Sequence, residues 1–299
     1  NLMSEEKINY DYNYIMLSVY FSILDENVNK LGDTTGSVDP SLWVATDGLG
    51  RELPTNTTRS TSKYRAVGMF YWTWHLQNNS TGPYNVNNIS NANPSRNNDY
   101  EWWNENYPIT SGSSYWWNES IYGYYMEDDD YVLRKQAELL ADAGVDFVVF
   151  DCTNSSLTWK SAYENLLKVW KKAQNDGINV PQVAFMLPFS YSSDSYTSFM
   201  DIYNNLYDTG SSNYQQYSSL LFKYNNKPLI LMDSSGAPSD LEALLANFEV
   251  RRVDASYFVE GDVTNGTWGW LSAYPQAYYK KVDGNAEQIS VGVAQNANY

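Results

Sequence analysis

The sequence contains a single cysteine and a single histidine, and these shortages exclude several kinds of site. Cys152 has no second cysteine to pair with, so an intramolecular disulfide is impossible. One cysteine and one histidine cannot supply an ordinary zinc site, which leaves only an oxygen-ligated ion such as calcium open. A nucleophilic thiol would need a histidine base, and His75 lies in a different segment. We therefore predict no metal centre and expect Cys152 to be a small buried side chain.

Basic residues are also scarce. Lys and Arg number 19 against 35 for Asp and Glu, which gives a formal net charge of -16. This charge would repel phosphates and anionic lipid head groups, so nucleic acid is not an expected partner. No run approaches the roughly 18 to 20 apolar residues of a membrane span, and the start NLMSEEKINY lacks a secretion-signal pattern. We expect a soluble protein.

Aromatic residues, in contrast, are abundant. They make up 16% of the chain, with 27 Tyr and 11 Trp, which is more than a core alone requires. Trp and Tyr offer flat apolar faces with a polar edge, and these suit the CH faces and hydroxyl rims of sugar rings. The surplus predicts a glycan-binding surface and a carbohydrate partner.

From Tyr64 onward the chain alternates short apolar runs with amphipathic segments, the pattern of a parallel α/β fold. We predict a TIM-type (β/α)8 barrel over residues 64–299, preceded by an N-terminal extension, residues 1–63, that packs on it. In that extension the apolar run from Tyr14 to Leu24 fits a helix or a buried strand equally well. About seven strands can be counted after Tyr64, so either one strand is missed or the barrel is incomplete at its C-terminal end.

Individual segments carry clear signals. Helices are predicted around 131–144, 161–177, 196–207 and 241–248, and strands around 64–72, 145–151, 182–188, 227–233, 251–258, 268–274 and 288–294. Asp128, Asp129 and Asp130 precede the first helix, where we interpret them as N-terminal caps rather than as a metal site. About fifty residues between His75 and Asp128, rich in Asn, Trp and Tyr, are expected to form a long functional loop.

Four segments carry a family resemblance: FYWTWH, SSYWWNESIYGYY, DDDYVLRKQAELLADAGVDFVVFDCTN and WGWLSAYPQ. There the chain resembles bacterial (β/α)-barrel proteins related to glycoside hydrolase families 71 and 99, from about Tyr64 onward and most specifically over Tyr125 to Asn154. The resemblance implies an enzyme for α-glucans or α-mannans with its site at the C-terminal strand ends and no redox or nucleotide cofactor. Those relatives carry a late Asn-Glu-Trp motif, and none follows Gln288 here.

Hydrolysis of a glycosidic bond usually takes two carboxyl groups, so acids at strand ends or in the loops above them are the catalytic candidates. Asp151 ends a continuously apolar strand and is followed by a polar turn. Glu119 lies in the aromatic loop at a Trp-x-Glu position of the resembling proteins. Asp233 and Glu260 follow later predicted strands and are reserve acids.

Other side chains in the same segments are candidates for substrate binding. His75 ends the first predicted strand, where a neutral imidazole could bind a sugar hydroxyl or orient a carboxylate. Gln276 and Arg252 are candidates for hydroxyl binding, although Arg252 fits a structural ion pair equally well. The stacking candidates are Trp72, Trp74, Trp116, Trp117, Trp268, Trp270 and Tyr274.

These observations favour a glycoside hydrolase that acts by paired-carboxylate chemistry on a polysaccharide or complex glycan. We expect the substrate to be α-linked and to be cleaved within the glycan chain, and we expect an extracellular, periplasmic or cell-surface location. The alternatives are a noncatalytic glycan-binding protein, or a structural or assembly protein, derived from such a barrel. A cleft with two carboxylates separates the enzyme from the noncatalytic binding protein, and a long, continuous intermolecular contact in place of a cleft would favour the structural or assembly protein.

Overall fold

The computed structural model describes residues 19–23, 65–72, 84–107, 116–117, 120–254, 256, 259, 261–269 and 276–292, with the backbone alone at 19–23, 116–117 and 292. The chain forms two compact units. The smaller unit comprises Asn1–Leu17 and Trp74–Met126, and the larger unit comprises Ser18–Thr73 and Glu127–Tyr299. A stretch of the predicted N-terminal extension thus belongs to the larger unit, and the predicted boundary at residue 63 stays a prediction.

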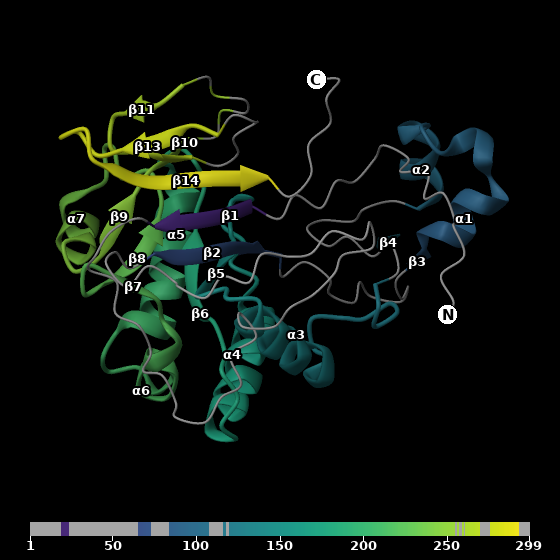
Figure 1. Ribbon diagram of the computed structural model, residues 1–299, viewed down its shortest axis with the longest axis horizontal. Coiled ribbons are helices and arrows are strands. Elements are labelled where there is room, and N and C mark those ends of the chain that lie inside the picture. Colours follow the sequence, from purple (N-terminus) through teal and green to yellow (C-terminus); the bar gives the residue numbers. More distant parts are fainter. Residues whose placement is uncertain are drawn as a thin grey trace, which may run out of the picture. The chain divides into compact units, whose positions relative to one another are not determined.

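The larger unit is built on one mixed sheet in which neighbouring strands mostly follow chain order (Figure 1). From β2 through β5, β6 and β8 to β9, every strand is parallel to the next. On the other side β1 is antiparallel to β2, and β14 is antiparallel to β1. The strands of this part are β1 (Val19–Ile23), β2 (Ala66–Tyr71), β5 (Phe147–Asp151), β6 (Gln182–Met186), β8 (Lys227–Leu231), β9 (Glu249–Arg251) and β14 (Ala286–Gly292).

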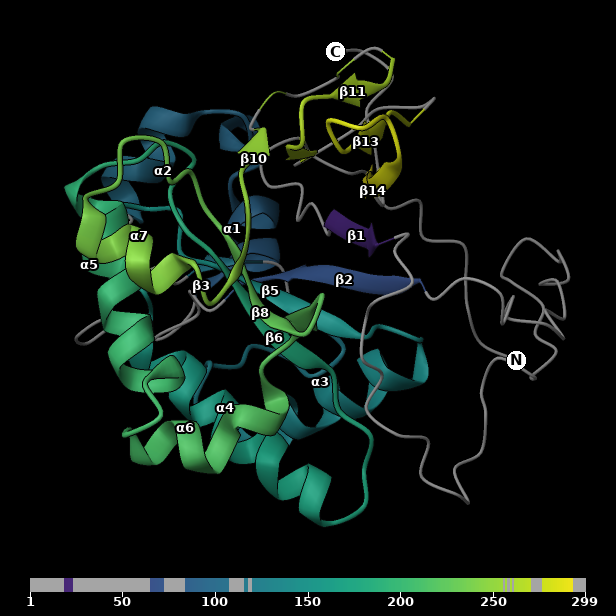
Figure 2. The ribbon, with the colours of Figure 1, turned by 90° about the vertical axis from the view of Figure 1, so that its left-hand side faces the viewer.

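Helices connect the parallel strands and cover their outer face (Figure 2). Asp129 caps the first of them by accepting from the N–H groups of Tyr131 and Val132, which confirms the capping interpretation of the acidic run. Ser192 and Ser211 cap two later helices in the same way. The helices are α3 (Asp130–Asp142), α4 (Lys160–Asn175), α5 (Ser193–Ile202), the π-helix η3 (Tyr203–Tyr207), α6 (Ser212–Tyr217), the 3-10 helix η4 (Ser218–Leu220) and α7 (Ser239–Leu245).

The sheet separates two apolar clusters, because successive strand side chains point to opposite faces. In β5, Val148 and Phe150 lie in the outer cluster, which packs against the helices. Phe147 and Val149 lie in the inner cluster on the other face. The inner cluster consists of Ala66, Phe70, Phe147, Val149, Ala184, Met186, Phe222, Tyr224, Leu229, Leu231, Val253 and Trp268. A side chain at position 68 would strike the ring of Phe147, so glycine is required there.

Short strands complete the larger unit: β7 (Lys223–Tyr224), β10 (Val253–Asp254), β11 (Val263–Thr264), β12 (Trp268–Gly269) and β13 (Tyr278–Lys280). β7 is antiparallel to β8, β13 is antiparallel to β14, and β11 is parallel to β13. β10 follows β9 after one residue and is parallel to β12. Between β12 and β14 the described residues show no backbone ladder. Instead, the Gln288 side chain accepts from the N–H of Gly269 at 2.9 Å and donates to its carbonyl at 3.2 Å. The α/β class is confirmed, and no closed barrel is seen in the described part of the chain.

A buried charge cluster lies next to this junction. The Glu287 carboxylate is 1% exposed and accepts hydrogen bonds from Tyr224, Trp268 and the Arg251 guanidinium at 2.8–3.1 Å. Arg251 also binds Glu249 and lies over the rings of Tyr224 and Trp268. Burial alone would raise the pKa of Glu287, but the hydrogen bond and charge of Arg251, with the other donors, lower it below its ordinary value.

The smaller unit is described only in parts, and these contain local structure where the sequence predicts a long loop. Asn85 and Asp99 cap its two α-helices through their side chains. Trp102, Trp103 and Tyr107 pack edge to face or tilted at centroid distances of 5.6–5.8 Å. The elements are β3 (Tyr84–Asn85), α1 (Val86–Ala92), the 3-10 helix η2 (Pro94–Arg96), α2 (Tyr100–Asn106) and β4 (Trp116–Trp117).

Most predicted elements of the larger unit are present. The run Tyr14 to Leu24, which fitted a helix or a strand, contains β1. The predicted strand around 251–258 begins earlier and is interrupted at Arg252. The prediction missed α6, because the segment SNYQQY has no apolar period and its helix starts from the Ser211 cap. None of the helices in the described ranges has the length and apolar content needed to cross a bilayer.

The Glu287 cluster gives a stability prediction. Glu287→Gln leaves the partly buried Arg251 without its main counter-ion, so the free energy of unfolding at pH 7 should fall by about 3–5 kcal/mol. Because the folded pKa of Glu287 is lowered, its contribution is complete well above the ordinary value of 4.5 and is lost as pH falls through the folded value. Denaturant titrations at pH 7 and at successively lower pH, with the exposed Glu242→Gln as control, measure both effects. Equal stability of the two variants at pH 7 would contradict this role.

Candidate functional site

The carboxyl ends of the parallel strands bring several polar and aromatic residues to one edge of the larger unit. Trp72 follows β2, Asp151 ends β5, and Asp233 comes two residues after β8. Arg252 lies between β9 and β10. Ligand sites in parallel α/β proteins are built at this edge, since the loops that follow the strands meet there. These residues form the candidate site.

Asp151 is a buried carboxyl on the inner face of the sheet. Its neighbours Phe150 and Cys152 belong to the outer cluster, so the alternation directs Asp151 to the inner face, above Val149. Its Oδ1 accepts from the Thr153 N–H at 3.0 Å and from the Thr153 hydroxyl at 2.6 Å. Its Oδ2 accepts no hydrogen bond from the described residues. Burial raises the pKa of Asp151, and the Thr153 hydrogen bonds only partly oppose this effect.

The loop from β5 to α4 has an unusual backbone. Ser155 and Trp159 both have positive φ, 53° and 54°. Left-handed backbone is costly for a bulky non-glycine residue such as Trp159, and it is held only where the surroundings fix it. Such residues cluster at functional sites, so the conformation agrees with the placement of Asp151 at the start of this loop.

Asp233 has a related turn but a different electrostatic environment. Its Oδ1 accepts from the Ser235 N–H at 2.9 Å, as Asp151 accepts from Thr153, two residues further along the chain. Its Oδ2 lies 3.6 Å from Nε of Arg252. Burial alone would raise the pKa of Asp233, but the side-chain and backbone hydrogen bonds of Ser235 and the charge of Arg252 lower it overall. The two acids at this edge are therefore shifted in opposite directions.

Aromatic side chains adjoin the inner face at the same edge. Trp72 and Phe189 are partly buried against the inner cluster, and Trp72 meets Phe70 edge to face at 5.9 Å. Because β2 pairs with β5, Trp72 follows β2 at the edge where β5 ends in Asp151, and it packs on the inner cluster rather than among the helices. Phe189 follows β6 and was not singled out from the sequence.

The structure places the other predicted site residues as follows. Trp268 is fully buried in the inner cluster and donates its Nε1–H to Glu287, so no face of its ring is exposed. Gln276 is half-buried just before β13, and Arg252 is exposed, with 59% of its side-chain surface accessible. Trp116 and Trp117 form β4 in the smaller unit. The predicted site residues that lie outside the described ranges are Glu119, Glu260, His75, Trp74, Trp270 and Tyr274.

Within the described ranges, no three His, Cys, Asp or Glu side chains are grouped so that they could hold a metal ion. Cys152 is buried, and burial raises its pKa well above the ordinary value, which keeps the thiol protonated. The candidate site therefore consists of carboxyl, guanidinium, hydroxyl and aromatic groups. Such a set can transfer protons and bind hydroxyl groups.

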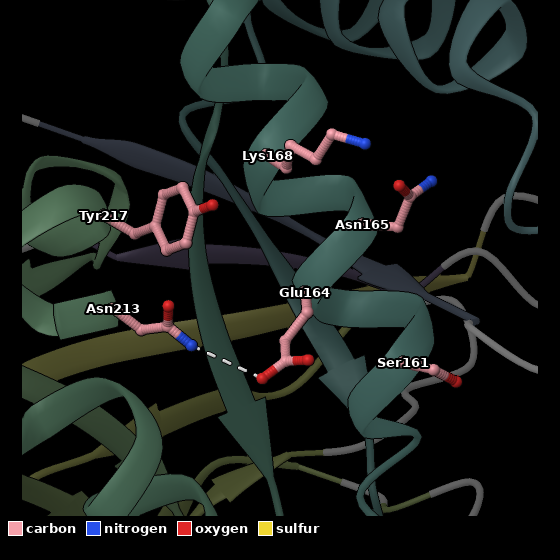
Figure 3. A pocket seen from close by; sticks show the side chains of 6 residues that line it. All are labelled: Ser161, Glu164, Asn165, Lys168, Asn213 and Tyr217. Carbon is pink, nitrogen blue, oxygen red and sulfur yellow. Dashed lines mark hydrogen bonds between the residues drawn. The ribbon is translucent and has the colours of Figure 1, made fainter. Parts of the chain in front are cut away.

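A shallow depression of about 380 Å³ lies elsewhere, between α4 and α6 (Figure 3). Within it the Asn213 amide donates to the Glu164 carboxylate at 3.4 Å, and Asn205 donates to the same oxygen at 2.9 Å. These helices belong to the outer layer, on the face of the sheet opposite the inner cluster. The depression is lined by Ser161, Glu164, Asn165, Lys168, Asn213 and Tyr217.

Thr153 and Ser235 were not predicted from the sequence as site residues. The signal that could have found them is the repeated spacing Asp-x-Thr or Asp-x-Ser directly after an apolar strand. In that spacing the hydroxyl residue donates its N–H back to the carboxylate two residues earlier, which closes an Asx turn. Both turns fix a carboxyl group at a strand end.

A buried carboxyl group with a raised pKa lowers the free energy of unfolding at the pH values where the group has to ionise. The folded state holds the proton of Asp151 more tightly than the unfolded state, so stability falls as pH rises from the ordinary value of 3.8 through the folded value. Asp151→Asn cannot ionise and keeps an oxygen for Thr153, so its free energy of unfolding at pH 7 should exceed that of the wild type by about 0.5–2 kcal/mol. Asp208→Asn, in an exposed turn closed by Gly210, is the matched control and should change little. A less stable Asp151→Asn protein would contradict the prediction.

Comparison with known proteins yields no relative for this chain. No family model matches it, and neither a curated protein nor a solved structure does. The candidate site is therefore defined by the chain's own residues.

Proposed function

We propose that the protein is a glycoside hydrolase that uses paired-carboxylate chemistry. The observation that carries the proposal is the presence of two acids, Asp151 and Asp233, after strands β5 and β8 at one edge of a parallel sheet, with pKa shifts of opposite sign. Glycosidases use two acids, one as proton donor and one as base or nucleophile. The surroundings of the two acids push their pKa values apart and so divide these roles.

The roles follow from the environments. Asp151, buried and with its pKa raised, is the proton donor to the departing glycosidic oxygen. Asp233, beside Arg252 and with its pKa lowered, is the carboxylate that attacks the sugar or activates water. Trp72 supplies an aromatic surface beside them for a sugar ring.

The sheet geometry leaves room for a sugar between these groups. Only β6 separates β5 from β8, so the two strands are roughly 10 Å apart. Met232 belongs to the outer cluster, and alternation therefore directs the next residue, Asp233, toward the inner face that Asp151 occupies. Carboxyl groups that converge from strands at this spacing can flank one glycosidic bond, as either class of glycosidase requires.

We further propose that the sheet is the wall of a (β/α)-barrel. Strands β2, β5, β6, β8 and β9 run parallel in chain order, which is the winding of a barrel rather than of a doubly wound sheet. β12 continues that order through its pairing with β10, which follows β9, while β1, β14, β13 and β11 extend the other edge. The Gln288 side chain links β14 to β12, although the backbone of β14 on the side away from β1 pairs with β13. In this arrangement β1, antiparallel to both its neighbours, is the strand that the sequence count lacked.

Gln288 tests the barrel proposal. Gln288→Leu removes both hydrogen bonds to Gly269 and leaves its buried backbone groups unpaired, which should cost about 1–3 kcal/mol of unfolding free energy. Amide hydrogen exchange should accelerate in β12 and β14 more than in β5 and β6, because the junction opens first. Uniform acceleration across all four strands would argue against a closed wall.

The substrate class rests on the aromatic surplus and on the family resemblance. We propose an α-linked polysaccharide or complex glycan, cleaved within its chain, and an extracellular, periplasmic or cell-surface site of action. The long aromatic segment that follows β2 in the sequence would suit an extended cleft. No nucleotide, redox or metal cofactor enters this chemistry.

The direct test is a reducing-end assay of the purified chain with α-glucans, α-mannans and host glycans. Wild type should cleave at least one of them, and Asp151→Asn and Asp233→Asn should each lower kcat by roughly 100-fold or more, as expected for loss of a general acid or base. Circular dichroism of each variant confirms folding. Asp208→Asn serves as the matched control.

The other predicted acids provide the opposing outcomes. If Glu119→Gln or Glu260→Gln abolishes cleavage while Asp233→Asn remains active, the second carboxyl group belongs to that residue and not to β8. Glycan binding without cleavage by wild type would overturn the hydrolase proposal in favour of a noncatalytic binding protein. Neither binding nor cleavage would favour a structural or assembly protein.

A further inference from the structure

We propose that Arg252 is a positioning residue for this reaction: its guanidinium, together with the turn at Ser235, holds the Asp233 carboxylate in the charged form, while Asp151 is buried and has no such cation. This inference rests on the proposed function for its catalytic meaning. The underlying interaction between Arg252 and Asp233 can be tested without any substrate.

The two acids have nearly the same local geometry. Each follows a parallel strand, and each accepts on Oδ1 from the N–H of a hydroxyl residue two positions later, Thr153 or Ser235. The turns alone therefore do not distinguish Asp151 from Asp233. Two things distinguish them: the deeper burial of Asp151, and the second oxygen. Oδ2 of Asp233 lies 3.6 Å from Nε of Arg252, and Oδ2 of Asp151 has no donor among the described residues.

The neighbouring strands supply no competing charge. β6, between the two acids, has no titratable side chain in Gln182–Met186. On β9, Arg251 is engaged by Glu249 and by Glu287, so its charge is already balanced. Among the described groups, Arg252 is the cation that acts on Asp233, and its charge adds to the hydrogen bonds of Ser235 in lowering the pKa of that carboxyl.

The position of Arg252 is fixed by the backbone although its side chain is exposed. Its carbonyl accepts from the Trp268 N–H at 2.9 Å, where β10 begins its pairing with β12. The guanidinium is 59% exposed at the site edge, so solvent and salt weaken its field. We therefore expect an effect of moderate size that decreases with ionic strength.

The experiment compares Arg252→Gln and Arg252→Lys with wild type in pH profiles of kcat/KM. Arg252→Gln should move the acidic limb to higher pH and lower kcat/KM roughly 2- to 5-fold on that limb, the size expected of one exposed ion pair. Arg252→Lys keeps the charge and should retain most of the wild-type profile. Arg134→Gln, which breaks the ion pair to Asp176 on the helical layer, is the matched control and should leave the limb in place.

A second readout does not depend on activity. Carboxyl ¹³C resonances of aspartate, with Asp233 assigned through Asp233→Asn, should show Asp233 titrating at higher pH in Arg252→Gln than in wild type. KM near neutral pH should be unchanged, whereas a role of Arg252 in binding hydroxyl groups would raise KM at every pH.

The outcomes separate the two proposals. If wild type cleaves glycans and Arg252→Gln shifts neither the acidic limb nor the Asp233 resonance, the positioning role is wrong and the proposed function stands. If wild type cleaves none of the substrates, the proposed function fails. The Asp233 titration in Arg252→Gln then still decides whether Arg252 holds that carboxylate charged.

Discussion

The larger unit depends on the burial of one carboxylate. Glu287 on β14 is almost completely removed from water and gathers donors from β7, β9 and β12. A buried charge is tolerated only when it is paired and hydrogen-bonded, so these segments must all be in place together. The last described strand of the unit is thereby tied to the same face of the sheet that the candidate site uses at its carboxyl ends.

The two faces of the sheet carry different kinds of side chain. The outer face packs against helices α3 to α7 through apolar contacts. In and just after β5, the residues that point to this face are Val148, Phe150 and Cys152, and all three are apolar. The inner face begins with apolar side chains and ends in carboxyl groups. Asp151 remains in a poorly solvated position, so the fold gives up some stability there, and this pattern is typical of residues retained for chemistry.

Much of this arrangement follows from the sequence, because strong local patterns specify it. The run VDFVVFD predicts a strand buried on both faces, and the acidic run before Tyr131 predicts a helix cap; both are present. Asp151 and Asp233 could be placed at strand ends for the same reason. Arg251 and Glu287 could not be paired from the sequence, since 36 residues separate them and nothing local links the two. The opposite pKa shifts were equally inaccessible, because they depend on burial and on the 3.6 Å approach of Arg252 to Asp233. Trp268 shows the converse limit: its position in an aromatic motif suggested a sugar contact, while the fold uses its indole to hold Glu287.

The pairing of β1 with both β2 and β14 has a consequence for biosynthesis. Val19 is opposite Gly292, so β1 acquires this partner only after all the residues between the two have been synthesised. Contacts between residues so far apart in the sequence form slowly, because a very long loop must close, with a loss of chain entropy, before the contact can stabilise the chain. Until then β1 presents an unpaired edge to other chains, and such edges promote aggregation. Production of the protein should therefore be limited less by its stability once folded than by protection of this early strand during translation.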